Sequence, residues 1–215
     1  MSRNFRFLAA RVTGLAISVF ARFMTAPRAI WQGIEPVQRQ RVYFANHSSN
    51  GDFVLLWTVL PAPLRRQTRP VAALDYWLKS PLRSFIGRDV FNAVLIDRRP
   101  EARTTDPVAQ MVEALEQGSS LILFPEGQRN SSDADLLPFK SGLYHLAKAR
   151  PGVDLVPVWI ANLNKVMPKG EIIPVPLICT LTFGAPLHLT PDEPKDIFLA
   201  RARSALLALQ ADPEA

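Results

Sequence analysis

Short, nearly unbroken apolar runs alternate with helical patterns along most of the chain, and this alternation limits the folds it can adopt. The apolar runs predict strands at residues 41–45, 70–74, 91–98, 119–124, 154–160 and 176–184. Helical patterns occupy residues 53–60, 75–87 (broken at Pro81), 106–118, 141–150 and 197–210, and a basic loop is predicted at 61–70. The alternation predicts an α/β fold with a mixed, largely parallel sheet, because strands covered by helices on both faces need no polar side.

The first thirty residues are the most apolar part of the chain. The longest run without a charged residue, Val12–Ala21, is ten residues long, whereas a helix that spans a bilayer needs about twenty. Polar residues recur at intervals of seven, at Asn4, Arg11, Ser18 and Thr25, with Arg22 one turn from Ser18, and the other face carries large apolar residues. This pattern predicts an amphipathic helix in a membrane interface, with its arginines near anionic head groups.

Three other interpretations of this segment stay open. A secretory signal would have a basic start and an apolar centre, although Arg11 interrupts that centre and no clean cleavage site follows. The helix could also pack on the protein core, or span the bilayer with its ends at the interfaces. We expect a membrane-interface segment over residues 1–34 and one α/β domain over 35–215, since 215 residues suffice for one core and a small appendage.

Charge and cysteine content narrow the class of partner. The formal net charge of +6 favours an anionic partner, which could be nucleic acid, an anionic membrane or a phosphorylated substrate. Because the arginines are scattered and no known nucleic-acid signature occurs, we expect no nucleic-acid partner. The single cysteine, Cys179, lies in an apolar run and is predicted to be buried. No cluster of histidine and cysteine predicts a metal site.

Three polar clusters follow predicted strands: NHSSNGD at 46–52, DRR at 97–99 and PEGQRN at 125–130. Ligands of largely parallel sheets bind at the carboxyl ends of the strands. The three clusters therefore predict one site at that edge of the sheet. By contrast, we expect His145 and His188 to be structural or exposed.

His47 and Asp52 are the strongest catalytic candidates. A carboxylate that bonds one imidazole nitrogen fixes the tautomer, leaves the other nitrogen free as a base and stabilises the imidazolium that forms. Ser48 and Ser49 lie next to the histidine but lack the G-x-S-x-G context of a serine nucleophile. A base without its own nucleophile indicates that the proton comes from a hydroxyl group of the substrate.

The other two clusters and the segment after them carry the features of an anion site. Gly127 permits a tight turn or a close approach to a ligand, and Arg129 offers a planar fork for phosphate. Glu126 could orient Arg129 or accept from a substrate hydroxyl. Lys140 precedes a predicted helix whose N-terminus favours anions, and Arg98 ends a predicted strand.

Taken together, these segments resemble the glycerolipid acyltransferase family, which includes lysophosphatidic acid acyltransferases. NHSSNGD is similar to its NHxxxxD motif and FPEGQRN to its FPEGTRS motif, about eighty residues later as in the family. VLIDR, LVPVWI and LPFKSGLYHLA are similar to further family segments, and the likeness is collinear over roughly residues 35–185. Gln128 and Asn130 depart from the usual threonine and serine.

The resemblance implies an acyltransferase of phospholipid biosynthesis. Such an enzyme moves a fatty acyl group from acyl-CoA or acyl-carrier protein to a lyso-glycerolipid hydroxyl, here 1-acylglycerol 3-phosphate giving phosphatidic acid. It also implies that His47 is the general base and Asp52 orients it. The acceptor phosphate would be bound by Glu126, Gly127 and Arg129, with Arg98 and Lys140 nearby. Backbone N–H groups at the turn could stabilise the oxyanion, and no metal or bound cofactor is required.

Two alternatives remain at this point. One is the same chemistry on another lyso-lipid, such as a lyso-ornithine lipid or a lysophospholipid. The other is a membrane lipid-binding protein without catalysis, which would not account for a paired histidine and aspartate at a strand end. The expected partners are membrane lipids and the acyl donor, and the expected location is the cytoplasmic face of a bacterial-like inner membrane.

Overall fold

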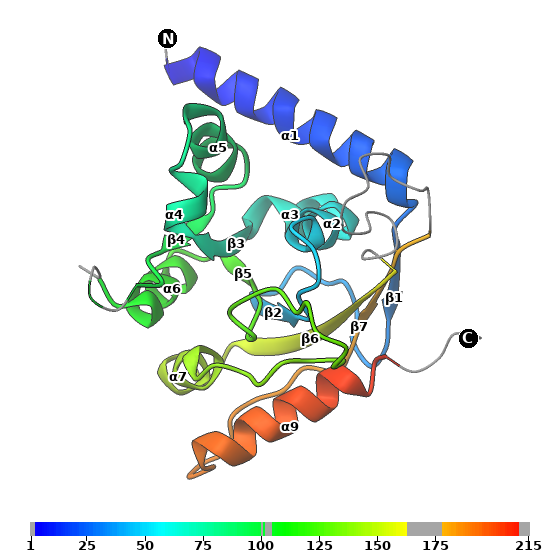
Figure 1. Ribbon diagram of the computed structural model, residues 1–215, viewed down its shortest axis with the longest axis vertical. Coiled ribbons are helices and arrows are strands. Elements are labelled where there is room, and N and C mark those ends of the chain that lie inside the picture. The colour runs from blue at the N-terminus through cyan, green and yellow to red at the C-terminus, as the bar shows by residue number, and fades with distance from the viewer. Residues whose placement is uncertain (1–2, 100, 102–104, 163–177, 211–215) are drawn as a thin grey trace.

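Seven strands form one sheet in the computed structural model, which describes residues 3–99, 101, 105–162 and 178–210 (Figure 1). Their order is β1-β7-β6-β2-β5-β3-β4. Among the described strands, β6 and β7 pair antiparallel and every other neighbouring pair is parallel, which confirms the predicted fold class. The strands are β1 (Arg28–Trp31), β2 (Arg41–Ala45), β3 (Thr68–Ala73), β4 (Val94–Ile96), β5 (Ser120–Leu123), β6 (Asp154–Ala161) and β7 (Thr180–Phe183).

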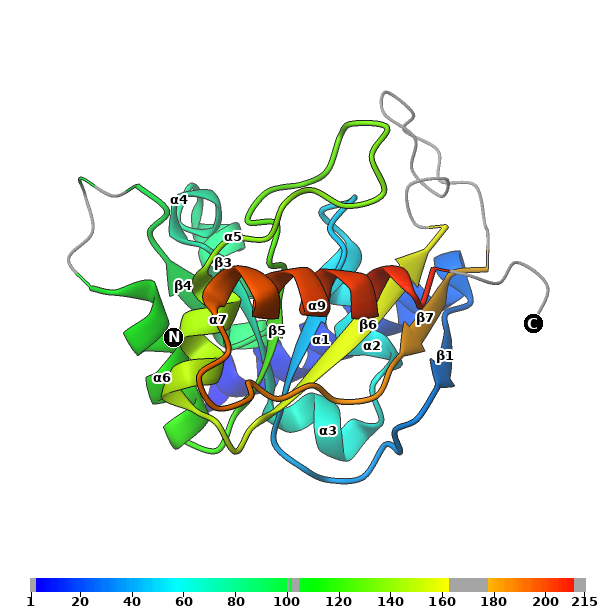
Figure 2. The same ribbon diagram turned by 90° about the horizontal axis from the view of Figure 1, so that it is seen from below.

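Helices cover both faces of this sheet (Figures 1 and 2). One face carries α6, α7 and α9, and the other carries α2 and α3, with α1 packed outside α2 and the π-helix η1. The helices are α1 (Arg3–Thr25), α2 (Asp52–Val59), α3 (Ala62–Gln67), α4 (Leu74–Trp77), α5 (Pro81–Phe85), η1 (Ile86–Val90), α6 (Pro107–Glu116), α7 (Gly142–Ala149) and α9 (Lys195–Leu207).

The central strand β2 shows why the apolar runs lack a polar side. Val42 and Phe44 pack into the core under α6, α7 and α9, whereas Tyr43 and Ala45 pack into the core under α2 and α3. All four side chains are fully buried. Because helices cover both faces of the sheet, no side chain along β2 is solvated. The strand is therefore a continuous apolar run instead of an alternation of apolar and polar residues.

The predicted basic loop at 61–70 is wrong. Residues 62–67 form α3, and β3 begins at Thr68. Leu64 anchors the short helix in the core, while Arg65 returns to α2, where its guanidinium lies over the Trp57 ring at 5.2 Å and donates to the carbonyl of Thr58 at 3.2 Å. The charged arginines give this segment no apolar helical pattern in the sequence. The short helix α3 is stabilised by its tertiary contacts.

Other elements differ at their ends. β1 was not predicted, and it pairs in parallel with β7 at the edge of the sheet. The break at Pro81 is confirmed, since α5 begins there. The predicted strands 91–98 and 176–184 are shorter in the structure, at β4 and β7, and residues 176 and 177 lie outside the described residues. The division at residue 34 stays a prediction, although residues 28–31 of the first segment join the sheet as β1.

The N-terminal helix α1 meets the protein through its small residues. Ala10, Gly14, Ser18 and Thr25 are buried. Ile17 and Met24 are half-buried. The other large apolar side chains of α1 are more than half exposed: Phe5, Phe7, Leu8, Val12, Leu15, Val19, Phe20 and Phe23. By length and composition alone, Asn4–Thr25 is also long and apolar enough to cross a membrane. This exposed apolar face is consistent with membrane association.

The polar stripe of α1 is divided between solvent and the protein, with Asn4 and Arg11 exposed. Ser18 and Thr25 face the protein. Arg22 donates to the carbonyl of Thr58 at 2.9 Å, and Arg6 pairs with Asp89 at 2.7 Å. Small polar side chains allow a close helix contact, and the arginines satisfy polar groups of the neighbouring elements. Those two arginines therefore fasten α1 to the body.

Candidate active site

The loop between β2 and α2 brings His47 and Asp52 together. His47 follows the end of β2 by two residues, and Asp52 is the first residue of α2. His47 Nδ1 lies 2.8 Å from Asp52 Oδ2, which also accepts the backbone N–H groups of Ser48 at 2.7 Å and Ser49 at 2.8 Å. Asp52 is fully buried, whereas the His47 side chain is 20% exposed. With Nδ1 engaged by the carboxylate, Nε2 is the nitrogen left to act as a base.

Asn46 fixes the point at which the chain leaves the sheet. Its side-chain nitrogen donates to the carbonyl of Ile160 at 3.0 Å, and its side-chain oxygen accepts the Ile160 N–H at 2.7 Å. This pair of bonds prolongs the β2–β6 ladder by one side chain beyond Ala45. The asparagine was missed as a site residue, although its place directly before His47 was a signal.

Glu126 holds the backbone around His47. Its Oε1 accepts the His47 N–H at 2.8 Å and its Oε2 accepts the Leu137 N–H at 2.9 Å. The Asn130 N–H donates to the His47 carbonyl at 2.7 Å. The loop after β5 therefore bonds both the N–H and the carbonyl of His47. Burial raises the pKa of the Glu126 carboxyl, and the two backbone N–H groups oppose that rise. The role of Glu126 in phosphate binding stays a prediction, and in the structure its two oxygens accept these backbone N–H groups.

Phe124 and Gly127 shape the same loop. The His47 ring stacks on the Phe124 ring with centroids 4.2 Å apart and planes at 20°. This contact covers one face of the imidazole and restricts the rotation of the ring. Gly127 has a φ of +72°, where a side chain would be strained, and an added Cβ would lie 3.1 Å from Lys140 Cγ. Phe124 was also missed by sequence reasoning.

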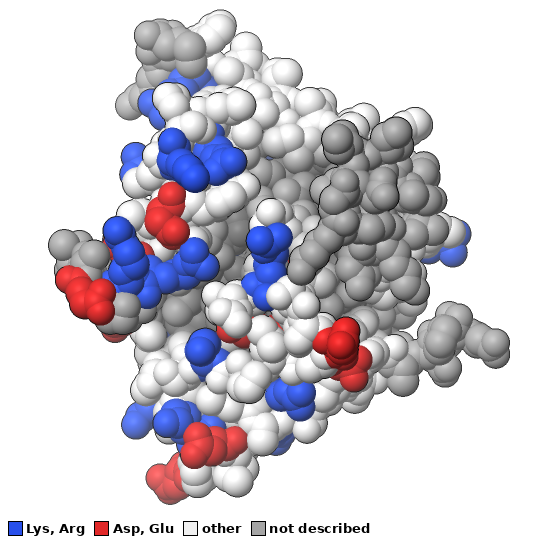
Figure 3. Space-filling model, viewed as in Figure 1, with Lys and Arg blue, Asp and Glu red and all other residues white. Residues whose placement is uncertain are grey.

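A cavity of about 690 Å³, here called the basic cavity, opens beside His47. Arg98, Gly127 and Arg129 line it together with His47. Much of the remaining wall is apolar, from Ile17 of α1, Phe53, Val71, Trp77, Phe91 and Ile96. Figure 3 looks onto this edge of the sheet and shows basic side chains gathered towards α4 and α5, with fewer acidic ones among them.

The predicted anion-binding residues are only partly brought together. Arg98 and Arg129 share the basic cavity, and Arg98 also contacts Asp75 at 3.4 Å. Lys140 lies against Gly127 and is not among the residues that line this cavity. In the described part of the chain, no three histidine, cysteine, aspartate or glutamate side chains are placed to hold a metal ion.

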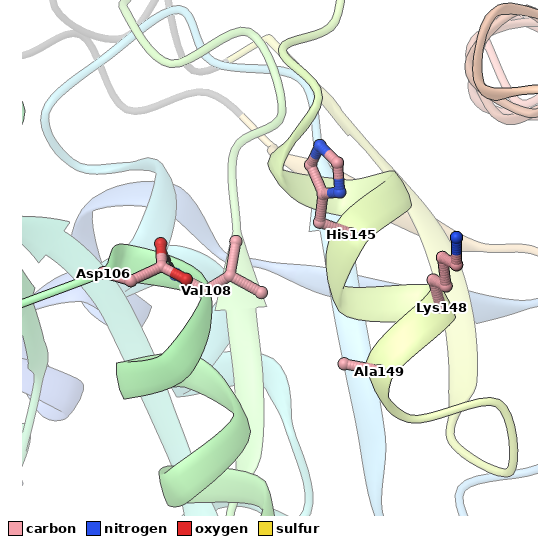
Figure 4. A pocket seen from close by; sticks show the side chains of 5 residues that line it. All are labelled: Asp106, Val108, His145, Lys148 and Ala149. Atoms are coloured by element: carbon pink, nitrogen blue, oxygen red, sulfur yellow. Dashed lines mark hydrogen bonds between the residues drawn. The ribbon is translucent and has the colours of Figure 1, made fainter.

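The other two histidines lie elsewhere. His145 lines a hollow between α6 and α7 with Lys148 and Asp106, and Asp106 caps α6 by accepting the Val108 N–H at 3.1 Å (Figure 4). Among the described residues, none places a carboxylate against the His145 ring. His188 Nε2 lies 3.0 Å from Asp154, which begins β6 at the opposite edge of the sheet.

The family model described as "Acyltransferase" matches residues 28–161, which include both loops of the site. The chain belongs to the acyltransferase family. It is similar at 30% identity over 164 residues to 1-acyl-sn-glycerol-3-phosphate acyltransferase of Limnanthes alba, covering 73% of this chain and 53% of that one. It is also similar at 33% identity over 133 residues to the enzyme of that name from Salmonella typhimurium, covering 58% and 49%.

A solved structure shares the fold of this acyltransferase. The crystal structure of the 1-acyl-sn-glycerophosphate (LPA) acyltransferase PlsC from Thermotoga maritima aligns with a TM-score of 0.69 and 22% identity, covering 94% of this chain and 80% of that one. At this identity the likeness establishes the fold. The chain spans about half the length of the two curated relatives named above.

Removing the Asn46 side chain tests the link between β2 and β6. We expect Asn46→Ala to lower the free energy of unfolding by about 1–3 kcal/mol, because two buried backbone groups of Ile160 lose their partner. Urea unfolding measures this. Asn50→Ala, an exposed change in the same loop, is the control and should stay within about 0.5 kcal/mol. Equal stabilities for the two variants would contradict the assigned role.

Proposed function

We propose that this acyltransferase moves a fatty acyl group from acyl-CoA or acyl-carrier protein to the free hydroxyl of 1-acylglycerol 3-phosphate, giving phosphatidic acid. The observation that carries the proposal is the carboxylate-bound imidazole of His47 at the wall of a cavity with two arginines and apolar sides. An acceptor with one phosphate, one hydroxyl and one acyl chain matches those three features. The names of the similar proteins agree with this acceptor.

In the proposed reaction, His47 Nε2 takes the proton of the acceptor hydroxyl as its oxygen attacks the thioester carbonyl. The tetrahedral intermediate collapses with cleavage of the C–S bond, and the departing thiolate recovers the proton from the imidazolium. Asp52 stabilises the imidazolium in between and keeps Nδ1 occupied. The thioester supplies the activated acyl group, so the proposed reaction uses no metal and no bound cofactor.

Oxyanion stabilisation cannot come from most of the β2–α2 turn. The N–H groups of Ser48 and Ser49 donate to Asp52, and that of His47 donates to Glu126. In the described part of the chain, the N–H groups of Gln128 and Arg129 have no protein partner, and both residues line the basic cavity. We propose that these two N–H groups donate hydrogen bonds to the oxyanion of the tetrahedral intermediate.

The acceptor would reach the basic cavity from a membrane. Ile17 places α1 in the cavity wall, while the opposite side of α1 exposes large apolar side chains. In the proposal, that exposed face enters the interface and presents the site to lipids. A lipid-binding protein without catalysis would use the same face, but would have no need for a carboxylate-bound histidine in the cavity.

A transfer assay with an acceptor panel tests the function. Purified protein in detergent receives a labelled long-chain acyl-CoA, or the acyl-carrier protein thioester, with 1-acylglycerol 3-phosphate, lyso-ornithine lipid or a lysophospholipid. We expect product chiefly from 1-acylglycerol 3-phosphate. Preferential product from another acceptor would contradict the acceptor assignment, and no product with any pair would contradict the reaction.

Removing the base tests the role of His47. We expect His47→Ala to lower kcat by roughly 10³-fold or more, because the imidazole that takes the proton of the acceptor hydroxyl is lost. Thermal unfolding should remain cooperative. His145→Ala, which removes the histidine of the hollow in Figure 4, is the control and should retain wild-type turnover. Near-normal activity of His47→Ala would refute the mechanism.

Removing a guanidinium tests the phosphate site. We expect Arg129→Ala to raise KM for the acceptor by roughly tenfold or more with a smaller change in kcat, since a charge-assisted bond to the phosphate is lost. Steady-state kinetics with varied acceptor measure this. Arg150→Ala, at the end of α7 and outside the cavity, is the control. An unchanged acceptor KM for Arg129→Ala would count against the site.

Polar replacement of the exposed face of α1 tests membrane docking. We expect Leu15→Gln with Phe20→Gln to weaken binding to phospholipid vesicles by roughly 100-fold or more, because each large apolar side chain contributes about 1.5–3 kcal/mol when buried. The free energy of unfolding should change little, since both side chains are exposed. Vesicle sedimentation measures binding, and Val37→Gln, an exposed apolar site outside α1, is the control. Unchanged sedimentation of the double variant would rule out this face.

A further inference from the structure

His47 lines a second cavity, of about 770 Å³, on the opposite side of the catalytic loop from the basic cavity. We call it the polar cavity. Its walls come from the carboxyl-end edge of β6 and its partner β7, from the loop after β5 and from the residues that follow α9. The base therefore stands between two cavities, and the proposed reaction needs places for two substrates.

The two cavities differ in charge. The basic cavity contains Arg98 and Arg129, whereas the described lining of the polar cavity contains no lysine or arginine and includes Asp133 and Asp135. Figure 3 shows an acidic group over the loop between β5 and α7, away from the basic side chains near α4 and α5. An anionic phosphate is favoured by the first cavity and disfavoured by the second.

The polar cavity is rich in uncharged groups that both donate and accept hydrogen bonds. Amide and hydroxyl side chains line it, from Gln32, Asn130, Asn162, Thr180, Thr182 and Gln210. Part of its wall is tied in place, because Gln210 donates to Asp135 at 2.7 Å and Arg203 donates to the Leu136 carbonyl at 2.9 Å. Such a lining suits a long, uncharged ligand that carries amides and a hydroxyl.

We infer that the polar cavity holds the pantetheine arm of the acyl donor, with its thioester at His47. Pantetheine is a narrow chain with two amides and a hydroxyl that ends in sulfur. The acceptor hydroxyl then attacks from the basic cavity, and the thiolate departs into the polar cavity, with His47 able to reach both. The inference rests on the proposed function and deepens it. CoA and acyl-carrier protein share this arm, so either source fits the cavity.

Disulfide trapping tests the inference without turnover. A cysteine thiolate introduced at the cavity attacks pantethine, the disulfide of pantetheine, which forms a mixed disulfide and releases one pantetheine. Ser48→Cys places the thiol in the polar cavity, and Asn50→Cys, two residues along the loop, places it in the basic cavity. The native Cys179 gives little background, because it is fully buried and burial raises its pKa to about 11.

The readout is the rate of mixed-disulfide formation by intact mass, divided for each variant by its rate with 2-hydroxyethyl disulfide. We expect this ratio to be roughly tenfold or more higher for Ser48→Cys than for Asn50→Cys, because binding raises the local concentration of the probe. Equal ratios, or a higher ratio for Asn50→Cys, would overturn the inference. CoA disulfide and the disulfide-linked carrier protein, used as competitors, distinguish the two sources of the arm.

Narrowing the cavity provides a second measurement. Thr180→Tyr adds bulk at the half-buried wall and is expected to raise KM for the donor several-fold while KM for the acceptor is unchanged. A rise in the acceptor KM alone would assign the polar cavity to the acceptor and overturn the inference. Wild-type transfer with unselective trapping would contradict the cavity assignment but keep the proposed function. Selective trapping without transfer to any acceptor would support the cavity assignment and contradict the proposed function.

Discussion

The buried carboxylate of Asp52 is the contact on which the site depends. One oxygen accepts two backbone N–H groups of the preceding loop and lies 2.8 Å from the imidazole of His47. Because Asp52 is also the first residue of α2, the helix, the loop and the imidazole are fixed by one group. A buried carboxylate is costly unless it is hydrogen-bonded, and the contacts that stabilise Asp52 Oδ2 are the same ones that orient the histidine.

Neighbouring strands then hold the loop against the edge of the sheet. Asn46 bonds the backbone of β6 at Ile160, and Glu126, from the loop after β5, bonds the backbone of His47. The imidazole stacks on Phe124 from that same loop. The base is thus positioned by strands on both sides of β2, which explains how a loop residue can be kept in one orientation. It also places His47 between the basic and polar cavities.

Much of this arrangement could be predicted from the sequence, because its signals are local. The apolar runs indicated the sheet, and the His47–Asp52 spacing indicated the pair that the structure places in contact. The sequence patterns did not predict the elements whose structure depends on tertiary contacts. α3 exists because Leu64 and Arg65 pack on α2, and β1 exists because β7 offers it an edge. Likewise, Ser18 and Thr25 look like a solvated stripe in sequence, but they are the small residues on which α1 docks. The bonds of Glu126 to the backbone of His47 and Leu137 join residues far apart in the sequence, so no local sequence pattern predicts them.

The most direct test of the account is the turnover of Asp52→Asn. The substitution keeps the shape of the side chain but removes its charge and can present an N–H group to His47 Nδ1, which would favour the wrong tautomer. The account predicts that kcat for acyl transfer falls by roughly 10²-fold or more, while KM for donor and acceptor stays within a few-fold and unfolding remains cooperative. Turnover close to wild type would show that the Asp52–His47 contact is structural and that another group activates the acceptor hydroxyl.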